Sequence, residues 1–547
     1  MRTSDQAHRA TGKIPLSAAE LNARIDAYVE AHWSDVVSDI DALVRIPSVE
    51  DPATAASGAP FGDKLREALE AALKMASDMG FSAHNVDGYI GYADFPGETE
   101  GQIGIIGHVD VVPAGPGWSF EPYAVTRKGG FLIGRGVADD KGPVVVALHA
   151  LKFWKDLQDA GAVPAFPYTV RFLFGANEET GMGDLAYYQQ RYEDPLFLFT
   201  PDASFPVSYG EKGLYGGILR SPRWYAENGE DVEDAKSGIE QAISGSEDEG
   251  GGEGGGEGAS AGNASSDNAC AQAESANPHR IVTMEGGTSS NAVPGTAFAI
   301  VRADASGLPA APRIAVSPAG EGCVRIEATG KSAHASLPAE GVNAILLVVD
   351  YLLENGLCSE DERAFLELER DLLAHTDGSG VGIACADEHF GELTAVGGVI
   401  YREDGRLCQT IDIRFPTSTT PAALTERLTE AAHRAGCTFE PLAKAEASPF
   451  LVDPESPMIQ ALLAAYNEAT GESAKPFTMG GATYARHFAS AASFGPEMPW
   501  LETPEWVGGM HGPDEGVSEE QMKKAFRIYA LTIGKLMEID FAQQRTC

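Results

Sequence analysis

The chain has 547 residues, which is too long for a single hydrophobic core, so two or more domains are expected. Its formal charge of −40 argues against nucleic acid as a partner and against binding to anionic membranes, because both need basic surface. The seven cysteines form no Cys-x-x-Cys pair, and no run approaches 18 apolar residues. These features predict a cytoplasmic protein with free thiols.

Helical and strand patterns alternate along residues 1–205, after a polar and frayed tail at about 1–20. Amphipathic helices are predicted at residues 21–44, 64–79 and 143–160. Short apolar runs that favour buried strands occur at residues 103–106, 131–133, 168–174 and 196–199. This alternation predicts an α/β fold in which a mixed sheet is flanked by helices.

The composition changes after this first part. Residues 206–445 mix strands and helices and indicate a separate α+β domain inserted into the first. Within it, every residue from Ser244 to Gly258 is Gly, Ser, Glu or Asp, which predicts a disordered acidic insert at about 223–280. Helical signals resume in residues 446–547, so this last part is expected to complete a first domain that is discontinuous in sequence.

Polar side chains gather where the predicted strands end, the usual place for sites in open α/β sheets. Each has an ordinary explanation alone: Asp139-Asp140 suits a helix N-cap, and Glu178-Glu179 suits a solvated helix start. Together, two imidazoles and several carboxylates suit a pair of divalent ions that share a bridging carboxylate. The residues concerned are His108, Asp110, Asp139, Glu178, Glu179, Asp202 and His511.

These motifs resemble those of the dinuclear zinc peptidase family, which includes carboxypeptidase G, acetylornithine deacetylase and succinyl-diaminopimelate desuccinylase. The likeness rests on His108-Val-Asp110, Gly134-Arg-Gly-Val-Ala-Asp139-Asp-Lys-Gly, Asn177-Glu178-Glu179-Thr-Gly and Pro201-Asp202. The bacterial branch of carnosinase-like or Xaa-His dipeptidases, of the PepV and Sapep kind, is similar at further segments. Those segments are Gly210-Glu-Lys-Gly213, Asp412-Ile-Arg414-Phe-Pro416 and Gly480-Gly481-Ala-Thr483-Tyr484-Ala-Arg486.

The resemblance implies a role for each matched residue. Two divalent ions are expected, Zn²⁺ first with Mn²⁺ or Co²⁺ as alternatives, held by His108, Asp139, Glu179, Asp202 and His511 with Asp139 as the bridge. Asp110 would orient His108, Glu178 would be the general base, and His334 would stabilise the oxyanion. The substrate would contact Asn291, Arg414, Gly480 and Gly481, with Arg414 gripping its terminal carboxylate.

The resemblance therefore implies a monomeric metal-dependent dipeptidase with a catalytic domain (1–205 and 446–547) and an inserted lid domain (206–445) that close over a dipeptide. One alternative keeps the chemistry and changes the substrate, as in an N-acyl-amino-acid deacylase or desuccinylase. Another is a non-enzymatic binding protein that retains the fold. The large inserted domain that carries His334 and Arg414 favours the dipeptidase, and a metal assay separates an enzyme from a binding protein.

Overall fold

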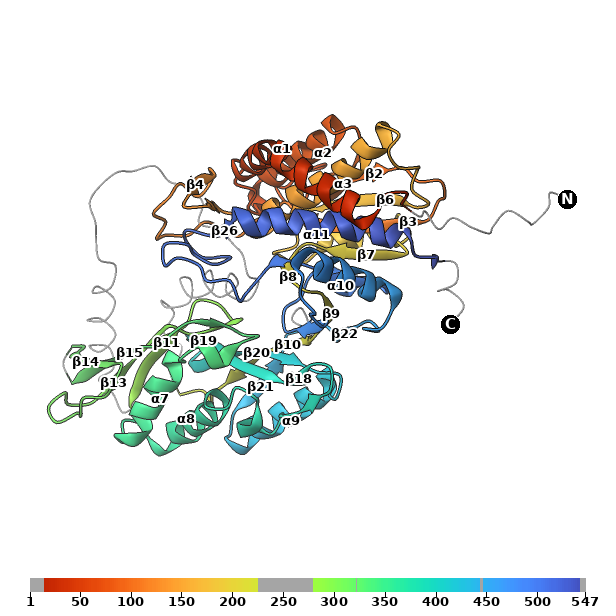
Figure 1. Ribbon diagram of the computed structural model, residues 1–547. Coiled ribbons are helices and arrows are strands. Elements are labelled where there is room, and N and C mark those ends of the chain that lie inside the picture. The colour runs from red at the N-terminus through yellow and green to blue at the C-terminus, as the bar shows by residue number, and fades with distance from the viewer. Residues whose placement is uncertain (1–13, 225–278, 321, 443–445, 542–547) are drawn as a thin grey trace. The chain divides into compact units, whose positions relative to one another are not determined.

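The computed structural model describes residues 14–224, 279–320, 322–442 and 446–541 (Figure 1). Nearly all of the predicted acidic insert and most of the predicted frayed tail lie outside these residues. The chain divides into two compact units. The first unit comprises the described parts of Met1–Gly210, Leu451–Thr478 and Ala482–Cys547, and the second those of Glu211–Phe450 and Met479–Gly481.

Within the described residues, the first unit is built on a nine-stranded mixed sheet with the order β1-β2-β6-β3-β7-β24-β9-β22 and with β23 paired to β9. The strands are β1 (Ser82–Val86), β2 (Ile90–Phe95), β3 (Gln102–His108), β6 (Thr169–Gly175), β7 (Phe197–Thr200), β9 (Ser208–Glu211), β22 (Phe450–Leu451), β23 (Phe477–Met479) and β24 (Ala491–Ser493). Because β3 pairs in parallel with both β6 and β7, the carboxyl ends of these three strands meet at one edge.

The helices of the first unit are α1 (Ala18–Val44), α2 (Asp63–Asp78), α3 (Lys141–Asp159), α4 (Gly183–Gln189), α10 (Pro457–Thr470) and α11 (Glu519–Met537). Helix α1 begins with a capping box between Ser17 and Glu20, which satisfies the first backbone N–H groups. Helix α3 lies beside α1 and α11 in Figure 1. It is buried around most of its circumference, and Trp154 donates its indole N–H to the carbonyl of Ala530 on α11.

Short elements complete this unit. Strand β5 (Phe131–Ile133) belongs to a separate three-stranded sheet of order β26-β5-β4, with β4 at Thr126–Lys128 and β26 at Gly516–Ser518. The loop that carries Asp139 therefore leaves a side sheet, whereas the sequence pattern favoured a strand of the main sheet. Strand β8 (Ala203–Ser204) pairs with β25 (Pro496–Glu497), and the 3-10 helices are η1 (Pro52–Thr54) and η5 (Tyr484–His487).

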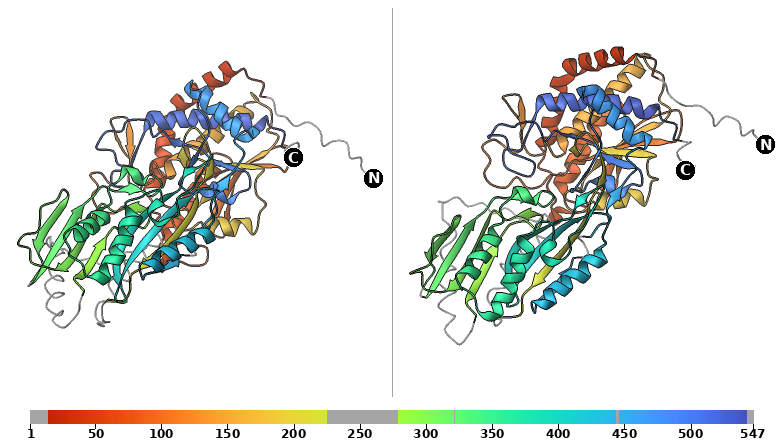
Figure 2. Two further views of the ribbon diagram at one scale, coloured as in Figure 1. Left: turned by 90° about the horizontal axis from the view of Figure 1, so that it is seen from below. Right: turned by 60° about the horizontal axis from the view of Figure 1, so that its bottom comes forward.

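The second unit contains, in its described part, an eight-stranded sheet of order β14-β15-β13-β11-β19-β20-β10-β21 whose neighbouring strands pair antiparallel. The strands are β10 (Gly213–Arg220), β11 (Ile281–Gly286), β13 (Thr296–Arg302), β14 (Ile314–Pro318), β15 (Cys323–Thr329), β19 (Thr394–Glu403), β20 (Arg406–Phe415) and β21 (Thr438–Pro441). Its helices, visible beside the strands in Figure 2, are α7 (Ala344–Glu354), α8 (Glu360–Leu373) and α9 (Pro421–Arg434).

Smaller pairs and turns in the second unit are β12 (Ala292–Val293) with β16 (Ala333–His334), β17 (Ala386–Asp387) with β18 (Gly391–Glu392), η2 (Pro338–Glu340) and η3 (Ser379–Val381). In the described part of this unit, one apolar core joins α7, α8 and α9 to the sheet. The predicted fold class, a mixed sheet with flanking helices together with an α+β domain, is confirmed.

The thiol prediction is wrong at one position. Cys323 is disulfide-bonded, whereas Cys358, Cys385, Cys408 and Cys437 are free. Among the described residues, no helix has both the length and the apolar composition needed to cross a membrane.

Candidate active site

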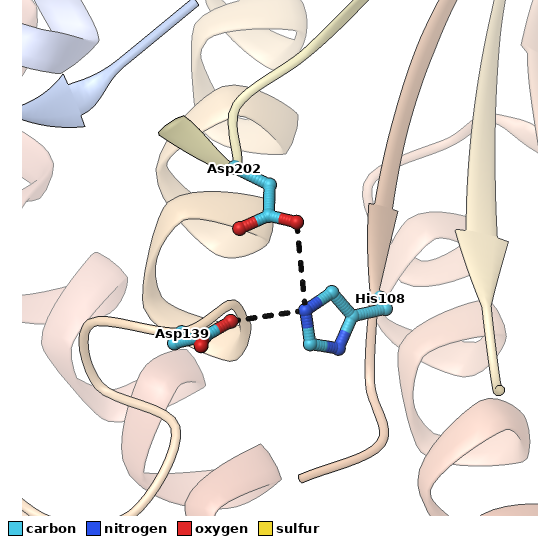
Figure 3. Close-up of side chains that lie close together, drawn as sticks. All are labelled: His108, Asp139 and Asp202. Carbon is cyan, nitrogen blue, oxygen red and sulfur yellow. Dashed lines mark hydrogen bonds and ion pairs between the residues drawn. The ribbon is translucent and has the colours of Figure 1, made fainter. Parts of the chain in front are cut away.

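The imidazole of His108 lies at the end of β3 and is completely buried. Its Nδ1 lies 3.0 Å from the main-chain oxygen of Asp110 and 3.4 Å from the Asp110 carboxylate. Its Nε2 faces the carboxylates of Asp139, at 3.0 Å, and Asp202, at 3.8 Å (Figure 3). The ring is therefore fixed by Asp110 on one side and presents its other nitrogen to two carboxylates.

The carboxylate of Asp139 lies between two imidazoles. Its Oδ1 faces His108, and its Oδ2 lies 2.9 Å from Nε2 of His511, which in turn lies 3.2 Å from Oε2 of Glu179. Two groups of potential metal ligands result: His108, Asp139 and Asp202 in one, and Asp139, Glu179 and His511 in the other. Asp139 belongs to both, which is the arrangement that a bridging carboxylate requires.

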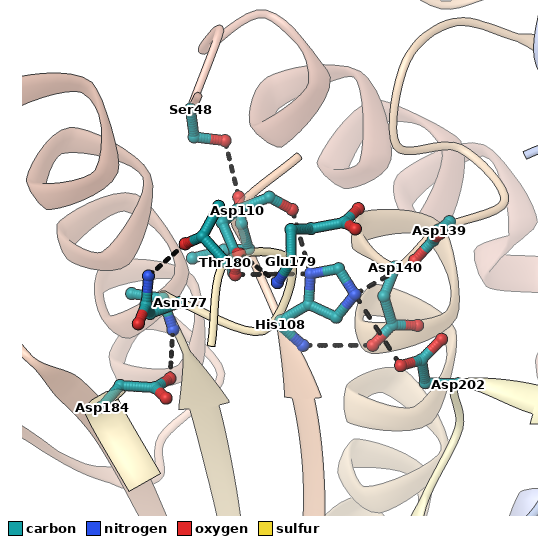
Figure 4. A network of polar contacts seen from close by, with 12 residues as sticks. Ser48, His108, Asp110, Asp139, Asp140, Asn177, Glu179, Thr180, Asp184 and Asp202 are labelled. Carbon is teal, nitrogen blue, oxygen red and sulfur yellow. Dashed lines mark hydrogen bonds and ion pairs between the residues drawn. The ribbon is translucent and has the colours of Figure 1, made fainter. Parts of the chain in front are cut away.

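The turn after β6 places two neighbouring glutamates differently. The backbone N–H of Glu179 donates to the Asp110 carboxylate at 3.0 Å (Figure 4), and Oε2 of its side chain lies 3.2 Å from Nε2 of His511. Within the described residues, no hydrogen bond or ion pair holds the Glu178 side chain. Burial, followed by the charge of Asp202, raises the pKa of Glu178 well above its ordinary value. Glu178 is thus a carboxyl group that retains a proton readily.

Crowded negative charge shifts other pKa values in the cluster. Burial, with the charge of Asp139 next, raises the pKa of Asp202 to about 8. Burial lowers the pKa of His511, but its hydrogen bonds to Asp139 and Glu179 outweigh this effect and raise that pKa to about 11. Burial alone would raise the pKa of Asp139, but hydrogen bonds to His108 and His511 hold it below its ordinary value. This concentration of carboxylates favours the binding of a cation.

The other predicted site residues lie in the second unit, where the structure brings most of them together. Strand pairing sets Ala292 opposite His334, and the N–H of Ala335 donates to the carbonyl of Asn291. The Nδ1 atom of His334 lies 2.7 Å from the hydroxyl of Ser336. A Cβ atom added at Gly480 would lie 2.7 Å from Cβ of Ser336, so only glycine allows this close approach.

Arg414 is buried on β20 and has a partner that the sequence prediction did not include. Its Nε and Nη2 atoms donate to the two carboxylate oxygens of Asp412, at 2.7 and 3.1 Å. Its Nη1 atom lies 3.4 Å from the carbonyl of Gly480. The Nε–Nη2 edge of the guanidinium is therefore engaged, and the Nη1–Nη2 edge is the one that can bind a second carboxylate. Gly481 follows next to Gly480, where an added Cβ would meet the end of the Met479 side chain.

Comparison with known proteins decides the family. The model of peptidase family M20/M25/M40 matches residues 104–535, which is most of the chain. The chain belongs to this family. The resemblance predicted from the motifs is confirmed, and the protein is a hydrolase of a peptidase family.

Relatives in this family match along nearly the whole chain. "Putative dipeptidase YtjP" of Bacillus subtilis (strain 168) is 27% identical over 514 residues, which cover 92% of this chain and 97% of the relative. "Putative dipeptidase SH1171" of Staphylococcus haemolyticus (strain JCSC1435) is 27% identical over 524 residues, covering 93% and 98%.

Solved structures share the fold at low identity. Human carnosine dipeptidase 1 has a TM-score of 0.51 and 14% identity, covering 95% of this chain and 100% of that chain. The di-peptidase Dug1p of Saccharomyces cerevisiae has a TM-score of 0.52 and 13% identity, covering 95% and 99%. These likenesses support the fold and carry no assignment of individual residues.

The two ligand groups of this M20 protein fit divalent ions. Ligands placed about 2.0–2.1 Å from a tetrahedral ion lie about 3.4 Å apart. The nitrogen–oxygen separations here are 3.0 and 3.8 Å in one group and 2.9 and 3.2 Å in the other. The buried Oε1 atom of Glu179 has no hydrogen-bond partner in the described part of the chain, as expected of an oxygen that binds an ion.

Several residues around the cluster were not predicted as parts of the site. Asp140 stands at the N-cap of α3 but makes no capping bond, and its carboxylate instead accepts the backbone N–H of His108 at 3.1 Å. Asp184 accepts hydrogen bonds from the N–H of Ala176 and, at 2.5 Å, from the hydroxyl of Tyr484, and so supports the turn of Glu178. Tyr484 lies in the motif that runs from Gly480 to Arg486, whereas no sequence motif marks Asp184.

Proposed function

We propose that this M20 protein is a metal-dependent dipeptidase that binds two divalent ions. The observation that supports it best is the position of Asp139, whose two oxygens face the Nε2 atoms of His108 and His511. One ion would be held by His108, Asp139 and Asp202, and the other by Asp139, Glu179 and His511. Zn²⁺ suits this set of nitrogen and oxygen ligands best, with Mn²⁺ or Co²⁺ as alternatives.

A bound pair of ions supplies Lewis acidity and a water molecule of lowered pKa. Glu178 is the general base: its carboxylate takes a proton from the attacking water and later delivers that proton to the nitrogen of the leaving amine. Asp110 keeps the His108 ring oriented through Nδ1, so that Nε2 faces the ion.

Residues of the second unit complete the proposal for the substrate. His334 stabilises the developing oxyanion, and Asn291, Gly480 and Gly481 contact the substrate backbone. Arg414 binds the terminal carboxylate through its Nη1–Nη2 edge, since Asp412 occupies the other edge. A clamp on the terminal carboxylate makes a dipeptide the preferred substrate, in agreement with the dipeptidase names of the relatives.

Two further parts of the proposal concern the state of the protein. The resemblance to the bacterial dipeptidase branch supports a monomer. Among the described cysteines, four free thiols against one disulfide-bonded residue, Cys323, support a cytoplasmic location. Size-exclusion chromatography with light scattering tests the first, and localisation of the native protein by fractionation tests the second.

Substrate panels test the proposed activity. Metal-free enzyme is reconstituted with Zn²⁺, Mn²⁺ or Co²⁺ and assayed on free dipeptides, the matching tripeptides, C-terminal dipeptide amides and N-acyl amino acids. We expect efficient cleavage of dipeptides, poor cleavage of tripeptides and almost none of amides. Preferential hydrolysis of N-acyl amino acids would instead establish a deacylase or desuccinylase.

A further inference from the structure

A buried carboxylate outside the two ligand groups organises the loop that carries Asp139. Glu515 is fully buried, and its Oε1 atom accepts three backbone N–H groups, from Gly136 at 3.0 Å, Ala138 at 3.0 Å and Asp139 at 3.2 Å. Three donors on one oxygen mean that the backbone of this loop is folded around the carboxylate. The last of these donors belongs to the bridging ligand itself.

The second oxygen of Glu515 is paired with a buried guanidinium. Arg135 is 1% exposed, and its Nη1 atom lies 2.5 Å from Oε2 of Glu515. Its Nη2 atom donates to the carbonyl of His511 at 3.2 Å and lies within 3.4 Å of two further carbonyls, those of Pro113 and Ala114. The same ion pair therefore contacts the main chain of Asp139 through Glu515 and that of His511 through Arg135.

Strand pairing reinforces this connection between two distant parts of the sequence. Strand β5 precedes the loop of Asp139, and β26 follows the loop of His511; the two strands pair with Gly516 opposite Ile133. His511 itself adopts a positive φ of 62°, an uncommon conformation for a residue other than glycine. Its backbone is thus held in place by its surroundings, and the Arg135 contact to its carbonyl is one of them.

We propose that Arg135 and Glu515 are positioning residues that set the distance between Asp139 and His511 and thereby set the affinity for divalent ions. This inference rests on the proposed function only in requiring that these two side chains bind metal. A buried ion pair adds little to stability compared with apolar residues of similar volume, so stability alone gives no reason for it here. Its contacts end on both ligands of one group, where geometry decides affinity.

A matched control separates this role from general support of the fold. Arg171 on β6 and Asp94 on β2 form a second largely buried ion pair in the same unit, with two contacts of 2.8 Å. In the described part of the chain, neither residue forms a hydrogen bond or ion pair with a potential metal ligand. Asp94→Asn should therefore destabilise the unit without changing metal binding.

The experiment compares metal-free unsubstituted protein with Glu515→Gln and Asp94→Asn. Co²⁺ is titrated into each, with binding followed by calorimetry and by the visible absorption of the bound ion, and thermal unfolding is recorded without metal. We expect Glu515→Gln to bind Co²⁺ about 10–100-fold more weakly and with an altered spectrum. We expect Asp94→Asn to unfold at lower temperature and to bind Co²⁺ as the unsubstituted protein does.

Arg135→Lys provides a milder test that also decides the question if Glu515→Gln does not fold. Lysine keeps a positive charge but carries it on a single nitrogen, so it cannot place separate nitrogens against Glu515 and the His511 carbonyl as the guanidinium of Arg135 does. Binding of the ion held with His511 should therefore weaken more than binding of the ion held with His108. Unchanged Co²⁺ affinity and spectrum in the folded variants would overturn the positioning role alone. An unsubstituted protein that binds no Co²⁺ would overturn the proposed function as well.

Discussion

At the scale of single residues, two neighbouring glutamates have different surroundings. Glu179 is fixed through its N–H to Asp110 and faces His511, whereas Glu178 is a partly buried carboxyl group without a hydrogen bond from the described residues. Adjacent positions in a turn point their side chains in different directions, which allows one to bind an ion while the other moves a proton. This difference supports the assignment of a ligand and a base.

Substitution of each glutamate separately tests this assignment. Glu178→Ala should lower turnover about 10²–10⁴-fold, the usual contribution of a general base, while two ions stay bound. Glu179→Ala should lose one ion, because it removes a ligand. Elemental analysis of both purified variants, together with dipeptide assays, provides the measurement. Loss of metal from Glu178→Ala would show that Glu178 is itself a ligand.

Arg414 gives a second prediction at this scale. Arg414→Ala should reduce the stabilisation of the transition state for a free dipeptide by about 2–5 kcal/mol. This is the usual cost of removing one partner of a buried charge pair. It should have little effect on the dipeptide amide, which lacks the carboxylate. Asp412→Asn should reduce the same preference for the free acid to a smaller extent, because it leaves the guanidinium in place but less well oriented.

The role of Arg414 is tested by measuring kcat/KM for the free dipeptide and its amide with the unsubstituted enzyme, Arg414→Ala and Asp412→Asn. An unsubstituted enzyme that cleaves the free and amidated dipeptides equally well would exclude the carboxylate clamp. The Asp412 contact was itself accessible from the sequence, since residues two apart on a strand share one face.

At the scale of elements, local patterns predicted the strands that carry the site. The apolar runs before His108, Asn177 and Thr200 correspond to β3, β6 and β7, because buried parallel strands are short and almost continuously apolar. The pairing of β5 with β26 was not predicted, since it joins segments about 380 residues apart in the chain. Glu515 was missed for the same reason: its partners are close in space only.

Helix α8 begins at a capping box formed by Ser359 and Glu362, and its exposed face is rich in charged residues. It also contains a buried carboxyl group. Glu369 is fully buried, neither of its oxygens has a hydrogen-bond partner among the described residues, and burial raises its pKa from 4.5 to about 8.

This buried acid predicts how the stability of the second unit depends on pH. The unfolded chain releases the proton of Glu369 above pH 4.5, whereas the folded chain keeps it until about pH 8, so stability falls as the pH rises between these values. The full loss is roughly 5 kcal/mol. Glu369→Met should remove this dependence and stabilise the protein most at pH 8 and above.

Urea unfolding at pH 5, 7 and 8.5 measures this effect. Glu367→Gln is the matched control, because Glu367 lies on the same helix with an exposed side chain and should leave the pH dependence unchanged. A difference in stability between Glu369→Met and the unsubstituted protein that is the same at all three pH values would contradict the prediction.

At the scale of the whole molecule, the predicted functional residues form two sets, one in each unit. The metal ligands and Glu178 belong to the first unit, and His334 and Arg414 belong to the second. The motifs of these two sets occur in different parts of the chain, which is why the sequence analysis assigns them to different domains. The separations within each set depend on side-chain packing and loop geometry, which motifs alone do not specify.

The most direct test of a dinuclear dipeptidase is a metal titration of the metal-free enzyme. Zn²⁺ or Mn²⁺ is added stepwise, and bound ions per chain are counted by elemental analysis while hydrolysis of a free dipeptide is measured on the same samples. We predict negligible turnover without metal and a maximum at two ions per chain. Full turnover in the presence of excess chelator, or no dipeptide hydrolysis with two ions bound, would contradict the proposed function.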